Sequence, residues 1–439
     1  MQKYYHEIRD PIHVFVYLDS YERKVLDSRP FQRLRSIHQL ALSYLVYPGA
    51  THKRFEHSLG VMELAAKVFD VVTSQQAIGD GVRRLVPELS QADALPYWRK
   101  VLRMAALCHD IGHLPFSHAA EHELLPNGWT HETLSVEIIR CPEMEEIWRS
   151  MIPPLRSDHI AKLAVGPKEY TQDTFTTWEN LLSEIVVGDA FGVDRMDYLL
   201  RDSHHAGVAY GKFDHFRLID TLRILPSLNS EEPSLGMEHG GLHSAEALLL
   251  ARYFMFQQVY LHPIRRVYDL HLKEFLTSWL PGGQFPTDVN EHLSHNDFEV
   301  LHSIQQAWAD AESPSHEAAK RIFERSHYKV VYSLSSADLD IHPQPGLVLY
   351  EALREKYGDQ YVRHDSYHGS AGGVIDFPVL NRNDEVVSAL SESKTLSGIP
   401  ASAIDFVFID PSFRDEARQW LAGEKLNLLT KAPVEGEEA

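Results

Sequence analysis

The chain has 439 residues, and its 42 Lys and Arg against 62 Asp and Glu give a net charge of −20, which argues against non-specific binding to nucleic acid or to an anionic membrane. Hydrophobic residues make up 44% and charged residues 24%, as in ordinary globular proteins, while the only two cysteines, Cys108 and Cys141, exclude a disulfide scaffold and indicate a reducing cytoplasm. We expect no membrane helix, because no run of roughly 18 apolar residues occurs, and no secretory signal, because the first residues lack a basic-then-apolar pattern.

The predicted elements between residues 20 and 330 are mostly helical. Leu59, Met62, Ala66 and Phe69 lie three or four positions apart, which predicts an amphipathic helix over 57–73. Further helices are predicted at 101–110, 178–202, 244–262, 298–310 and 316–325, with an exposed loop at 281–297. Because strand signals are few in this stretch, we predict a mainly α fold class with a helical domain over residues 1–328.

The pattern changes after residue 328. Strands are predicted at 329–333, 374–379, 386–390 and 403–409, helices at 346–357 and 411–421, and a turn at 381–384. These elements predict a small C-terminal α+β unit over residues 329–430. Residues 431–439 form an acidic tail that we expect to be frayed.

Histidine is unusually frequent: there are 26 histidines, about 6% of the chain, and seven of them lie between His52 and His131. Imidazole is a common metal ligand and carries protons near neutral pH, so this region is the first place to look for chemistry. Adjacent His109 and Asp110, at the end of a predicted helix, offer one nitrogen and one carboxylate oxygen to a single ion. His113 follows one helical turn later on the same face.

Three further segments, RFEHSLG, WTHE and GVDRMDYLLRD, place polar side chains beside apolar helical runs. In the last of them, Asp194, Tyr198 and Asp202 recur every four residues and share one face of a helix. A His-Asp dipeptide alone is a weak signal. The second such pair, His364-Asp365, lies in a polar stretch without the surrounding pattern, and we interpret it as a chance pair on the surface.

The order of these segments is specific. The histidine in RFEHS, the pair in HDIGH and the aspartate in GVDRMDY resemble the signature of the HD superfamily of metal-dependent phosphohydrolases. The segments DPIH, FQRLR, YPGA, HDIGHLPFSH, WTHE and DRMDYLLRDSHHAG resemble more closely the deoxynucleoside triphosphate triphosphohydrolases, which include bacterial enzymes and the human enzyme with a sterile-alpha-motif appendage. The resemblance covers roughly residues 8–265 and implies an HD core at about 50–205.

The resemblance makes His57, His109, Asp110 and Asp194 the ligands of a divalent metal ion, at least one per subunit. Two imidazoles and two carboxylates suit Fe, Mn, Zn or Mg better than a metal that demands thiolates. The alternative is that these are buried polar residues at helix ends that satisfy one another. That arrangement would bury two carboxylates and two histidines without an ion, at a considerable desolvation cost.

The same resemblance assigns proton transfer and phosphate contacts to three histidines, His113, His118 and His131, with Glu121 and Glu132 as their carboxylate partners. A histidine with a nearly neutral pKa can protonate the departing 5′ oxygen. We predict that His118 is this general acid and that His131 supports it. The family has aspartate where this chain has Glu121, and the longer side chain changes the hydrogen-bond reach.

An acidic protein needs local cations to bind a triphosphate, and the resemblance places Arg54, Arg195 and Arg252 at that task, with arginine replacing the usual lysine at position 195. The remaining substrate contacts that the resemblance implies are Tyr198 and Tyr260 against the sugar and phosphates, Asp202 on the 3′-hydroxyl, and Gln39 and Leu40 around the deoxyribose. We expect Tyr260 to discriminate against ribonucleotides by crowding the 2′ position. The alternative for the helix at 244–262 is that its aromatic face is core.

The N-terminal part suggests a second, effector site. Asp27, Gln32 and Arg35 match positions at which some family members recognise a guanine nucleotide between subunits, and Arg217 matches a further contact. The chain departs from that pattern at Arg9 and in the stretch 238–241, which lacks the basic residues that hold effector phosphates. Two interpretations of these residues stay open: they bind an activating nucleotide, or they form only a solvated helix face.

Taken together, the resemblance implies that water attacks the α-phosphorus of a deoxynucleoside triphosphate and releases a deoxynucleoside and intact triphosphate. It also implies a cytoplasmic homo-oligomer, a dimer or a tetramer, whose assembly or regulation involves the C-terminal unit. Two alternatives stay open: an HD nucleotidase or phosphodiesterase acting on another nucleotide, and a catalytically silent nucleotide-sensing scaffold.

Overall fold

The computed structural model describes residues 5–74, 78, 80–91, 93–116, 121–229, 232–368 and 375–430, and gives only the backbone of residues 80, 81, 121 and 122. The chain divides into two compact units. The first comprises Met1–Met255, Leu280–His302 and Val374–Ile399, and the second Phe256–Trp279, Ser303–Gly373 and Pro400–Ala439. Within the described ranges, no helix combines the length and the apolar character needed to cross a bilayer.

The first unit is mainly helical, as predicted. Its helices are α1 (Glu22–Asp27), α2 (Arg29–Arg33), α3 (Arg54–Val72), α4 (Asp80–Leu85), α5 (Ala94–Cys108), α6 (Glu121–Leu124), α7 (His131–Ile139), α8 (Pro142–Ser150), α9 (Ser157–Glu169), α10 (Thr177–Val187), α11 (Val193–Ala206), α12 (His215–Asp220), α13 (Leu242–Met255), α15 (Val289–His292), α20 (Ala389–Glu392) and α21 (Lys394–Ser397). Helix α16 (Asp297–Ala309) begins in this unit and ends in the second.

Helix α3 is the centre of the first unit. The apolar residues that predict an amphipathic helix, including Leu59, Met62 and Phe69, are buried, and so are Val61 and Leu64 on other faces. A helix that is apolar on most sides lies inside a fold rather than on its surface. Helices α5 and α11 accordingly pack against α3, and α9 packs against both α5 and α10.

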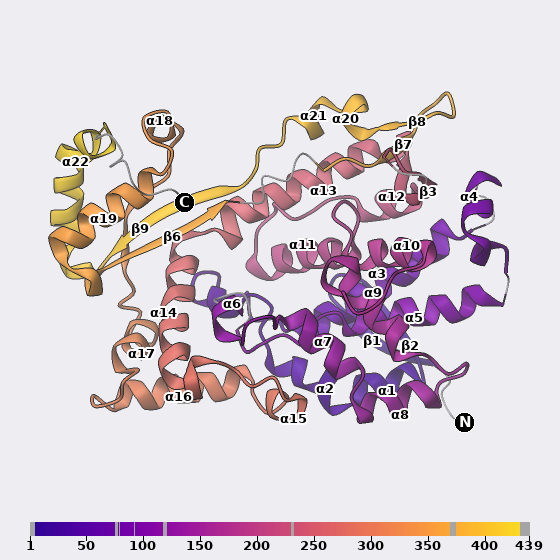
Figure 1. Cartoon of the computed structure of the whole chain (residues 1–439), viewed down its shortest axis with the longest axis horizontal. Helices are drawn as coiled ribbons and strands as arrows, with labels where there is room; N and C mark the ends of the chain where they lie inside the picture. The colour runs from indigo at the N-terminus through magenta and orange to yellow at the C-terminus, as the bar shows by residue number, and fades with distance from the viewer. Residues whose placement is uncertain are drawn as a thin grey trace. The chain divides into compact units, whose positions relative to one another are not determined.

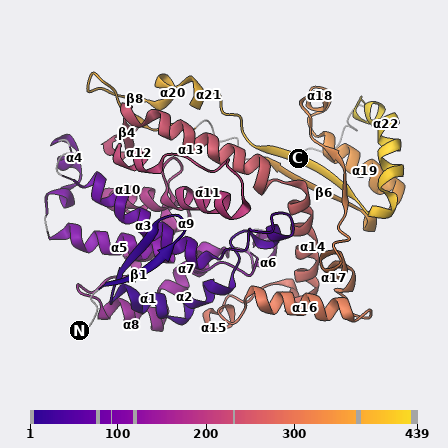
Figure 2. The same cartoon turned by 180° about the vertical axis from the view of Figure 1, so that it is seen from behind.

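Two small sheets complete the first unit, and the sequence pattern gave no sign of most of their strands. Antiparallel β1 (Tyr5–Asp10) and β2 (Val14–Asp19) form a ribbon that contacts α1 and α3 (Figure 2). The second sheet has the order β3-β4-β7-β8, formed by β3 (Leu222–Pro226), β4 (Pro233–Glu238), β7 (Pro378–Leu380) and β8 (Val386–Ser388). Because β7 pairs in parallel with β4, the segment around it belongs to the first compact unit, across the predicted domain boundary at residue 328.

The second unit has an α+β core. Its strands β5 (Lys329–Ser333), β6 (Val362–His368) and β9 (Ala403–Ile409) form an antiparallel sheet in the order β5-β9-β6, and its helices are α14 (Pro263–Trp279), α17 (His316–Phe323), α18 (Ser336–Leu339), α19 (Pro345–Tyr357) and α22 (Arg414–Thr430). Helix α19 packs on this sheet and on α22 (Figure 1). Strands β5 and β9 have the bounds that the sequence predicts.

Short helical turns connect the main elements. They are η1 (Leu34–Ser36), η2 (Ala41–Leu45), η3 (Pro87–Ser90), η4 (His239–Gly241), η5, a π-helical turn (Phe256–Tyr260), η6 (Pro281–Gly283), η7 (Asp359–Tyr361) and η8 (Pro411–Phe413). The predicted helix at 244–262 therefore consists of α13 and the π-helical turn. The loop predicted at 281–297 contains η6 and α15.

Two predicted elements are shorter than expected for local reasons. The helix predicted at 178–202 is two helices, because the backbone is extended at Gly188, which ends α10, and at Gly192, which precedes α11. The strand predicted at 386–390 ends at Ser388, whose side chain caps α20 by accepting a hydrogen bond from the amide of Leu390 at 3.1 Å. The predicted acidic tail lies outside the described residues.

The interpretation of His364-Asp365 as a chance surface pair is wrong. Asp365 is buried and accepts two hydrogen bonds from the guanidinium of Arg266, at 2.7 and 2.6 Å. His364 Nε2 lies 2.6 Å from Asp405 Oδ1. The pair therefore joins β6 to α14 and to β9, and its role is to hold the second unit together.

Glu274 of α14 provides a pH test of this unit. Burial raises the pKa of Glu274, but His271 at 3.1 Å and Arg363 at 2.5 Å outweigh burial and lower the pKa from 4.5 to about 2. A depressed pKa means that the carboxylate stabilises the fold above pH 4.5 and that this stabilisation is lost as the pH falls through 2. We expect Glu274→Gln to lower the free energy of unfolding by up to about 3 kcal/mol at pH 7.

Urea unfolding at several pH values measures this difference. We expect it to disappear below about pH 2, where Glu274 is protonated in both folded and unfolded chains. An equal loss of stability at pH 7 and below pH 2 would show that the charge of Glu274 is not the cause.

Candidate metal centre

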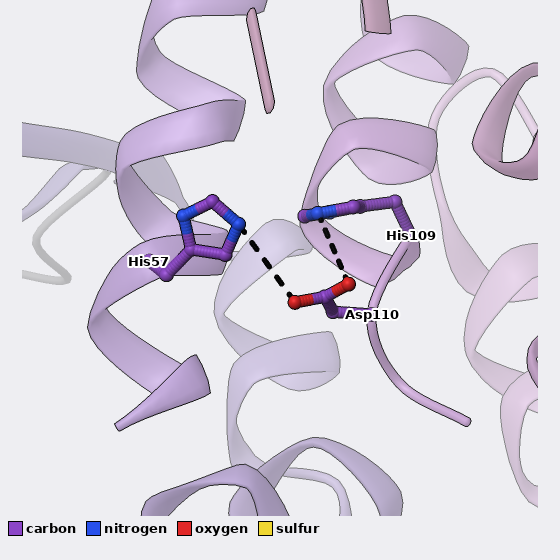
Figure 3. A group of neighbouring side chains, drawn as sticks. All are labelled: His57, His109 and Asp110. Carbon is purple, nitrogen blue, oxygen red and sulfur yellow. Dashed lines mark ion pairs between the residues drawn. The ribbon is translucent and has the colours of Figure 1, made fainter. Parts of the chain in front are cut away.

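The four predicted metal ligands converge in the first unit. His57 lies in the first turn of α3, His109 and Asp110 follow the last turn of α5, and Asp194 lies in the first turn of α11. The Nε2 atom of His57 is 3.0 Å from Asp194 Oδ1 and 3.7 Å from Asp110 Oδ2. The Nε2 atom of His109 is 3.3 Å from Asp110 Oδ1 and 3.4 Å from Asp194 Oδ1. In Figure 3 the side chains of His57 and His109 face the carboxylate of Asp110 from two helices.

Each of the two histidines is oriented through its other ring nitrogen. His57 Nδ1 lies 2.8 Å from Asp197 Oδ2, and His109 Nδ1 lies 2.9 Å from the carbonyl oxygen of Ala106. With Nδ1 held in this way, Nε2 is the ring atom that faces the carboxylates, and it can bind a cation once it has lost its proton. Metal-binding histidines in proteins are held in this way.

The donor set fits a divalent cation. The ligand atoms of His57, His109 and Asp110 lie within 4.8 Å of one another, and all three residues are buried. His109 Nε2 is a buried atom that makes no hydrogen bond, although two carboxylates face it. A nitrogen lone pair in this position is a group that a cation would satisfy.

The ionisation of the site reflects its concentration of negative charge. Burial lowers the pKa of His57, but hydrogen bonds with Asp194 and Asp197 outweigh burial and raise the pKa to about 10. Burial raises the pKa of Asp110, but the neighbouring His109 and Arg54 hold the pKa well below its usual range. The carboxylates are therefore ionised at neutral pH, and the site favours an added positive charge.

Two of the predicted catalytic histidines lie beside this cluster. His113 Nε2 is 3.0 Å from Asp110 Oδ1, and the ring of His113 stacks on that of His131 with centroids 3.8 Å apart. His131 Nδ1 lies 3.2 Å from Glu132 Oε2. Burial lowers the pKa of His113 well below its ordinary value, and Arg54 and His131 add to this effect, so its ring is neutral.

Glycine permits the approach of α7 to this cluster. A Cβ atom on Gly112 would lie 2.2 Å from the carbonyl oxygen of His131. Of the other two predicted catalytic residues, His118 lies outside the described residues, and the structure gives no side chain for Glu121.

Two of the three arginines that the resemblance assigns to phosphates, Arg54 and Arg195, have carboxylate partners in the structure. Buried Arg54 donates to Asp110 Oδ2 at 2.5 Å. Arg195 donates to Asp189 Oδ1 at 2.9 Å and to the carbonyl oxygen of Gly188 at 2.9 Å. The guanidinium groups are therefore held in place by the protein before any phosphate is bound.

Tyr198 lies among these charges. Burial raises the pKa of Tyr198 to about 12, while the charges of Arg195 and Arg252 act in the opposite direction. The charges of Arg195 and Arg252 thus both reach the hydroxyl group of Tyr198. Tyr260 belongs to the second unit.

Two of the residues predicted to contact the sugar, Asp202 and Gln39, both contact His52. Asp202 Oδ1 lies 2.7 Å from His52 Nε2, and the backbone amide of Gln39 donates to the carbonyl oxygen of His52 at 3.0 Å. The side-chain oxygen of Gln39 is buried and makes no hydrogen bond, and Leu40 is buried next to it in the chain. Sequence reasoning missed His52.

The candidate effector residues have local partners. Asp27 accepts from Arg23 at 2.7 Å in an exposed pair one helical turn apart. Arg35 donates to Gln32 Oε1 at 3.0 Å and lies over the ring of Phe55. Arg217 donates to the carbonyl oxygen of Gly240 at 3.1 Å.

Sequence reasoning also missed a buried network behind the metal ligands. Asp197 accepts from Arg201 Nε at 2.7 Å and lies 2.6 Å from His13 Nε2, and Arg201 donates to Asp10 at 2.9 Å. Gly60 of α3 permits this approach, because a Cβ atom there would lie 1.9 Å from Asp197 Oδ1. Through Asp197 the network fixes the ring of His57. The available signal was the spacing of Asp197 and Arg201, four apart in DRMDYLLRD.

Two families match the sequence: HD domain over residues 54–148 and HD associated region over residues 219–359. An uncharacterized protein of Methanocaldococcus jannaschii, MJ1154, is 36% identical over 333 residues, which are 76% of this chain and 61% of that protein. The deoxynucleoside triphosphate triphosphohydrolase SAMHD1 of Gallus gallus is 29% identical over 397 residues, 84% of this chain and 59% of that protein. The chain thus spans about three fifths of the length of these two relatives.

A solved structure of a hypothetical protein from Aquifex aeolicus has the same fold. It is 31% identical to this chain and superposes with a TM-score of 0.77 over 95% of this chain and 100% of that one.

Proposed function

The chain belongs to the HD-domain phosphohydrolase family, and we propose that it hydrolyses deoxynucleoside triphosphates to a deoxynucleoside and inorganic triphosphate in a metal-dependent reaction. The observation that carries the proposal is the convergence of His57, His109, Asp110 and Asp194, whose donor atoms approach to between 3.0 and 3.7 Å. The substrate is proposed because a relative that aligns with 84% of this chain, at 29% identity, is named a deoxynucleoside triphosphate triphosphohydrolase.

The four ligands would hold the ion at the junction of α3, α5 and α11. When bound, a divalent ion supplies positive charge that favours deprotonation of a water molecule and polarises a phosphoryl oxygen. Asp197 fixes the ring orientation of His57, and the carbonyl oxygen of Ala106 fixes that of His109, so that both Nε2 atoms face the ion. Ligands held in advance lose little freedom when the ion binds.

The remaining site residues would bind the substrate and move one proton. Arg54, Arg195 and Arg252 would neutralise the charge of the triphosphate. A guanidinium has five N–H donors, so one that is paired with a carboxylate still has N–H groups left for phosphate oxygens. Neutral His113, stacked on His131, offers a hydrogen bond to a phosphate oxygen. As the water oxygen bonds to the α-phosphorus, the bond from phosphorus to the 5′ oxygen breaks, and His118 protonates that oxygen. Glu121 and Glu132 support these histidines.

The proposal includes the remaining predictions from the resemblance. Asp202, Tyr198, Tyr260, Gln39 and Leu40 would bind the deoxynucleoside. The effector residues would bind an activating nucleotide, and the enzyme would work as a cytoplasmic homo-oligomer. The alternative chemistry, cleavage of another nucleotide by an HD nucleotidase or phosphodiesterase, has the same metal ligands but different products.

Incubation of the purified chain and Mn²⁺ with each of the four deoxynucleoside triphosphates, alone and in pairs, tests the proposal. We expect deoxynucleoside and triphosphate in equal amounts. We also expect EDTA to stop the reaction, because it removes the divalent ion from the carboxylate and imidazole ligands. A rate that rises only in paired incubations would demonstrate activation. Release of phosphate or pyrophosphate would favour the alternative chemistry, and tight binding without cleavage would favour a sensor.

A further inference from the structure

The segment at 284–297, which we call the strap, lies against the domain that carries the proposed metal ligands. The sequence pattern predicts an exposed loop here, but Phe285 and Asp297 are buried. The amide of Phe285 donates to the carbonyl oxygen of Leu124 at 2.8 Å. The strap belongs to the matched HD associated region, and this contact fastens it to the matched HD domain at 54–148.

Asp297, the last residue of the strap, is fully buried and accepts three hydrogen bonds. Its Oδ2 atom lies 2.6 Å from the backbone nitrogen of His38 and 2.6 Å from Nδ1 of the same histidine. Its Oδ1 atom accepts from the amide of Phe116 at 2.9 Å. A buried carboxylate that holds three donors fixes the parts of the chain that bear them. Asp297 therefore joins two loops that are distant in the sequence.

Each of these two loops carries residues of the proposed substrate site. His38 directly precedes Gln39 and Leu40, which are proposed to surround the deoxyribose. Phe116 comes three residues after His113, which is proposed to contact a phosphate oxygen. A side chain that fixes His38 relative to Phe116 therefore fixes the two sides of that site relative to each other.

A buried arginine connects the strap to the second loop once more. Arg33 donates from Nε to the carbonyl oxygen of His295 at 2.8 Å and from Nη1 to the carbonyl oxygen of His113 at 2.9 Å. The strap thus reaches this loop at two points, at His113 through Arg33 and at Phe116 through Asp297. Two points of attachment prevent the loop from turning about either one.

The backbone of Phe116 needs such an anchor. Its φ is 52°, in the left-handed region, which is strained for a residue with a side chain and persists only where the surroundings hold it. The ring of Phe116 stacks on that of His38 with centroids 5.6 Å apart, and the ring of Tyr44 stacks on His38 with centroids 5.4 Å apart. Backbone strain of this kind is found at functional sites, where a fixed geometry is required.

The ring of His38 is held at both of its nitrogens. Because the carboxylate of Asp297 can only accept, Nδ1 carries the proton, and Nε2 is the acceptor for Lys53 Nζ at 2.6 Å. Lys53 directly precedes Arg54 at the start of α3, the helix that carries the proposed metal ligand His57. The contacts from Asp297 through His38 to Lys53 therefore connect the strap to the start of α3.

We propose that Asp297 is a positioning residue of the active site: it holds the loop of Gln39 and the loop of His113 in the relative position that the substrate requires. The HD associated region thereby completes the site of the HD domain. The inference rests on the proposed function for the reaction itself. It adds a residue that acts through His38 and Phe116 and does not touch the substrate.

Kinetics of Asp297→Asn with a deoxynucleoside triphosphate and Mn²⁺ test the proposal. Whichever way the asparagine amide is turned, its nitrogen faces a donor of His38 or of Phe116. We therefore expect kcat/KM to fall at least about tenfold, while the content of bound metal stays unchanged because no proposed metal ligand is altered. Rates are expressed per metal-loaded molecule, so that a merely structural loss of folded protein does not lower them.

Asp288→Asn is the matched control. Asp288 is an exposed aspartate of the same strap, and it accepts only from local amides, those of Asn290 at 2.9 Å and Glu291 at 3.1 Å. Asparagine caps a helix as well as aspartate does, so we expect this variant to keep both activity and metal.

His38→Phe is a second variant, and it tests the same claim if Asp297→Asn does not fold. It keeps a ring between Tyr44 and Phe116 but removes the contacts of the imidazole with Asp297 and Lys53. We expect a loss of at least about threefold in kcat/KM. Because both residues act through one network, we expect the double variant to lose no more than about twofold beyond the weaker single variant. Losses that multiply in the double variant would overturn the proposal.

Hydrogen exchange of the full chain, followed by mass spectrometry, separates this inference from the proposed function because it needs no turnover. We expect peptides that contain His38 and Phe116 to exchange at least about tenfold faster in Asp297→Asn, with no change in α9. If the unmodified chain cleaves no deoxynucleoside triphosphate, the proposed function fails, and faster exchange at both loops still supports the positioning by Asp297. Unchanged exchange at either loop, or unchanged kcat/KM in Asp297→Asn at full metal content, would overturn the inference.

Discussion

Asp194→Ala is expected to abolish metal binding and to lower the turnover rate at least about a thousandfold, while the helical fold persists. The carboxylate of Asp194 contacts the Nε2 atoms of both His57 and His109 through one oxygen, Oδ1, whereas Asp110 reaches the two histidines through different oxygens. Asp194 is partly exposed at the first turn of α11, where alanine is well tolerated.

Metal analysis of the purified protein and assay of triphosphate release measure the two effects on the same sample. Asp158→Ala is a suitable control, since it removes an aspartate that pairs with Arg140 at the surface. We expect the control to keep both metal and activity. Turnover by Asp194→Ala at the unmodified rate would refute the assigned ligand set.

Asp197→Ala is expected to cost about 3–5 kcal/mol of folding stability, the loss typical of breaking a buried ion pair. Both Asp197 and Arg201 have no exposed side-chain surface, and the substitution would leave Arg201 and His13 without their common carboxylate. The chain offers a matched control: Asp70 and Arg99 form a similar bidentate pair, with both contacts at 2.7 Å, but at the surface. We expect Asp70→Ala to cost roughly 0–1 kcal/mol.

Urea unfolding followed by circular dichroism measures both variants. A loss from Asp197→Ala no larger than that from Asp70→Ala would show that the buried network does not stabilise the first unit. The milder Asp197→Asn keeps the shape of the side chain but not its charge. Because the ring of His57 loses its charged partner, we expect the metal affinity of Asp197→Asn to fall by about 10–100-fold, as for other partners of metal-binding histidines.

The candidate metal ligands could be picked out from the sequence because each lies at or beside the end of a predicted helix. The motif around His109 and Asp110 lies at the end of an apolar run, and the helix of His57 is apolar along most of its length. The helices themselves could therefore be predicted from the sequence pattern. That three of them bring these residues together was expected only from the resemblance to the family.

What could not be predicted depends on contacts between distant parts of the chain. His13 reaches Asp197 across 184 positions, and no local pattern marks that pairing. Strands β1 to β4 were missed because each is only five or six residues long and contains at least one charged residue, which weakens the strand pattern. Likewise, the burial of Asp365 follows only from its pairing with Arg266 of a distant helix.

Hydrolysis of a deoxynucleoside triphosphate in ¹⁸O-labelled water, with mass analysis of the products, tests the central proposal most directly. Attack of water at the α-phosphorus with cleavage of the bond to the 5′ oxygen places the label in triphosphate and leaves the deoxynucleoside unlabelled. We expect this result. Label in the deoxynucleoside, or in phosphate or pyrophosphate instead of triphosphate, would contradict the proposed reaction.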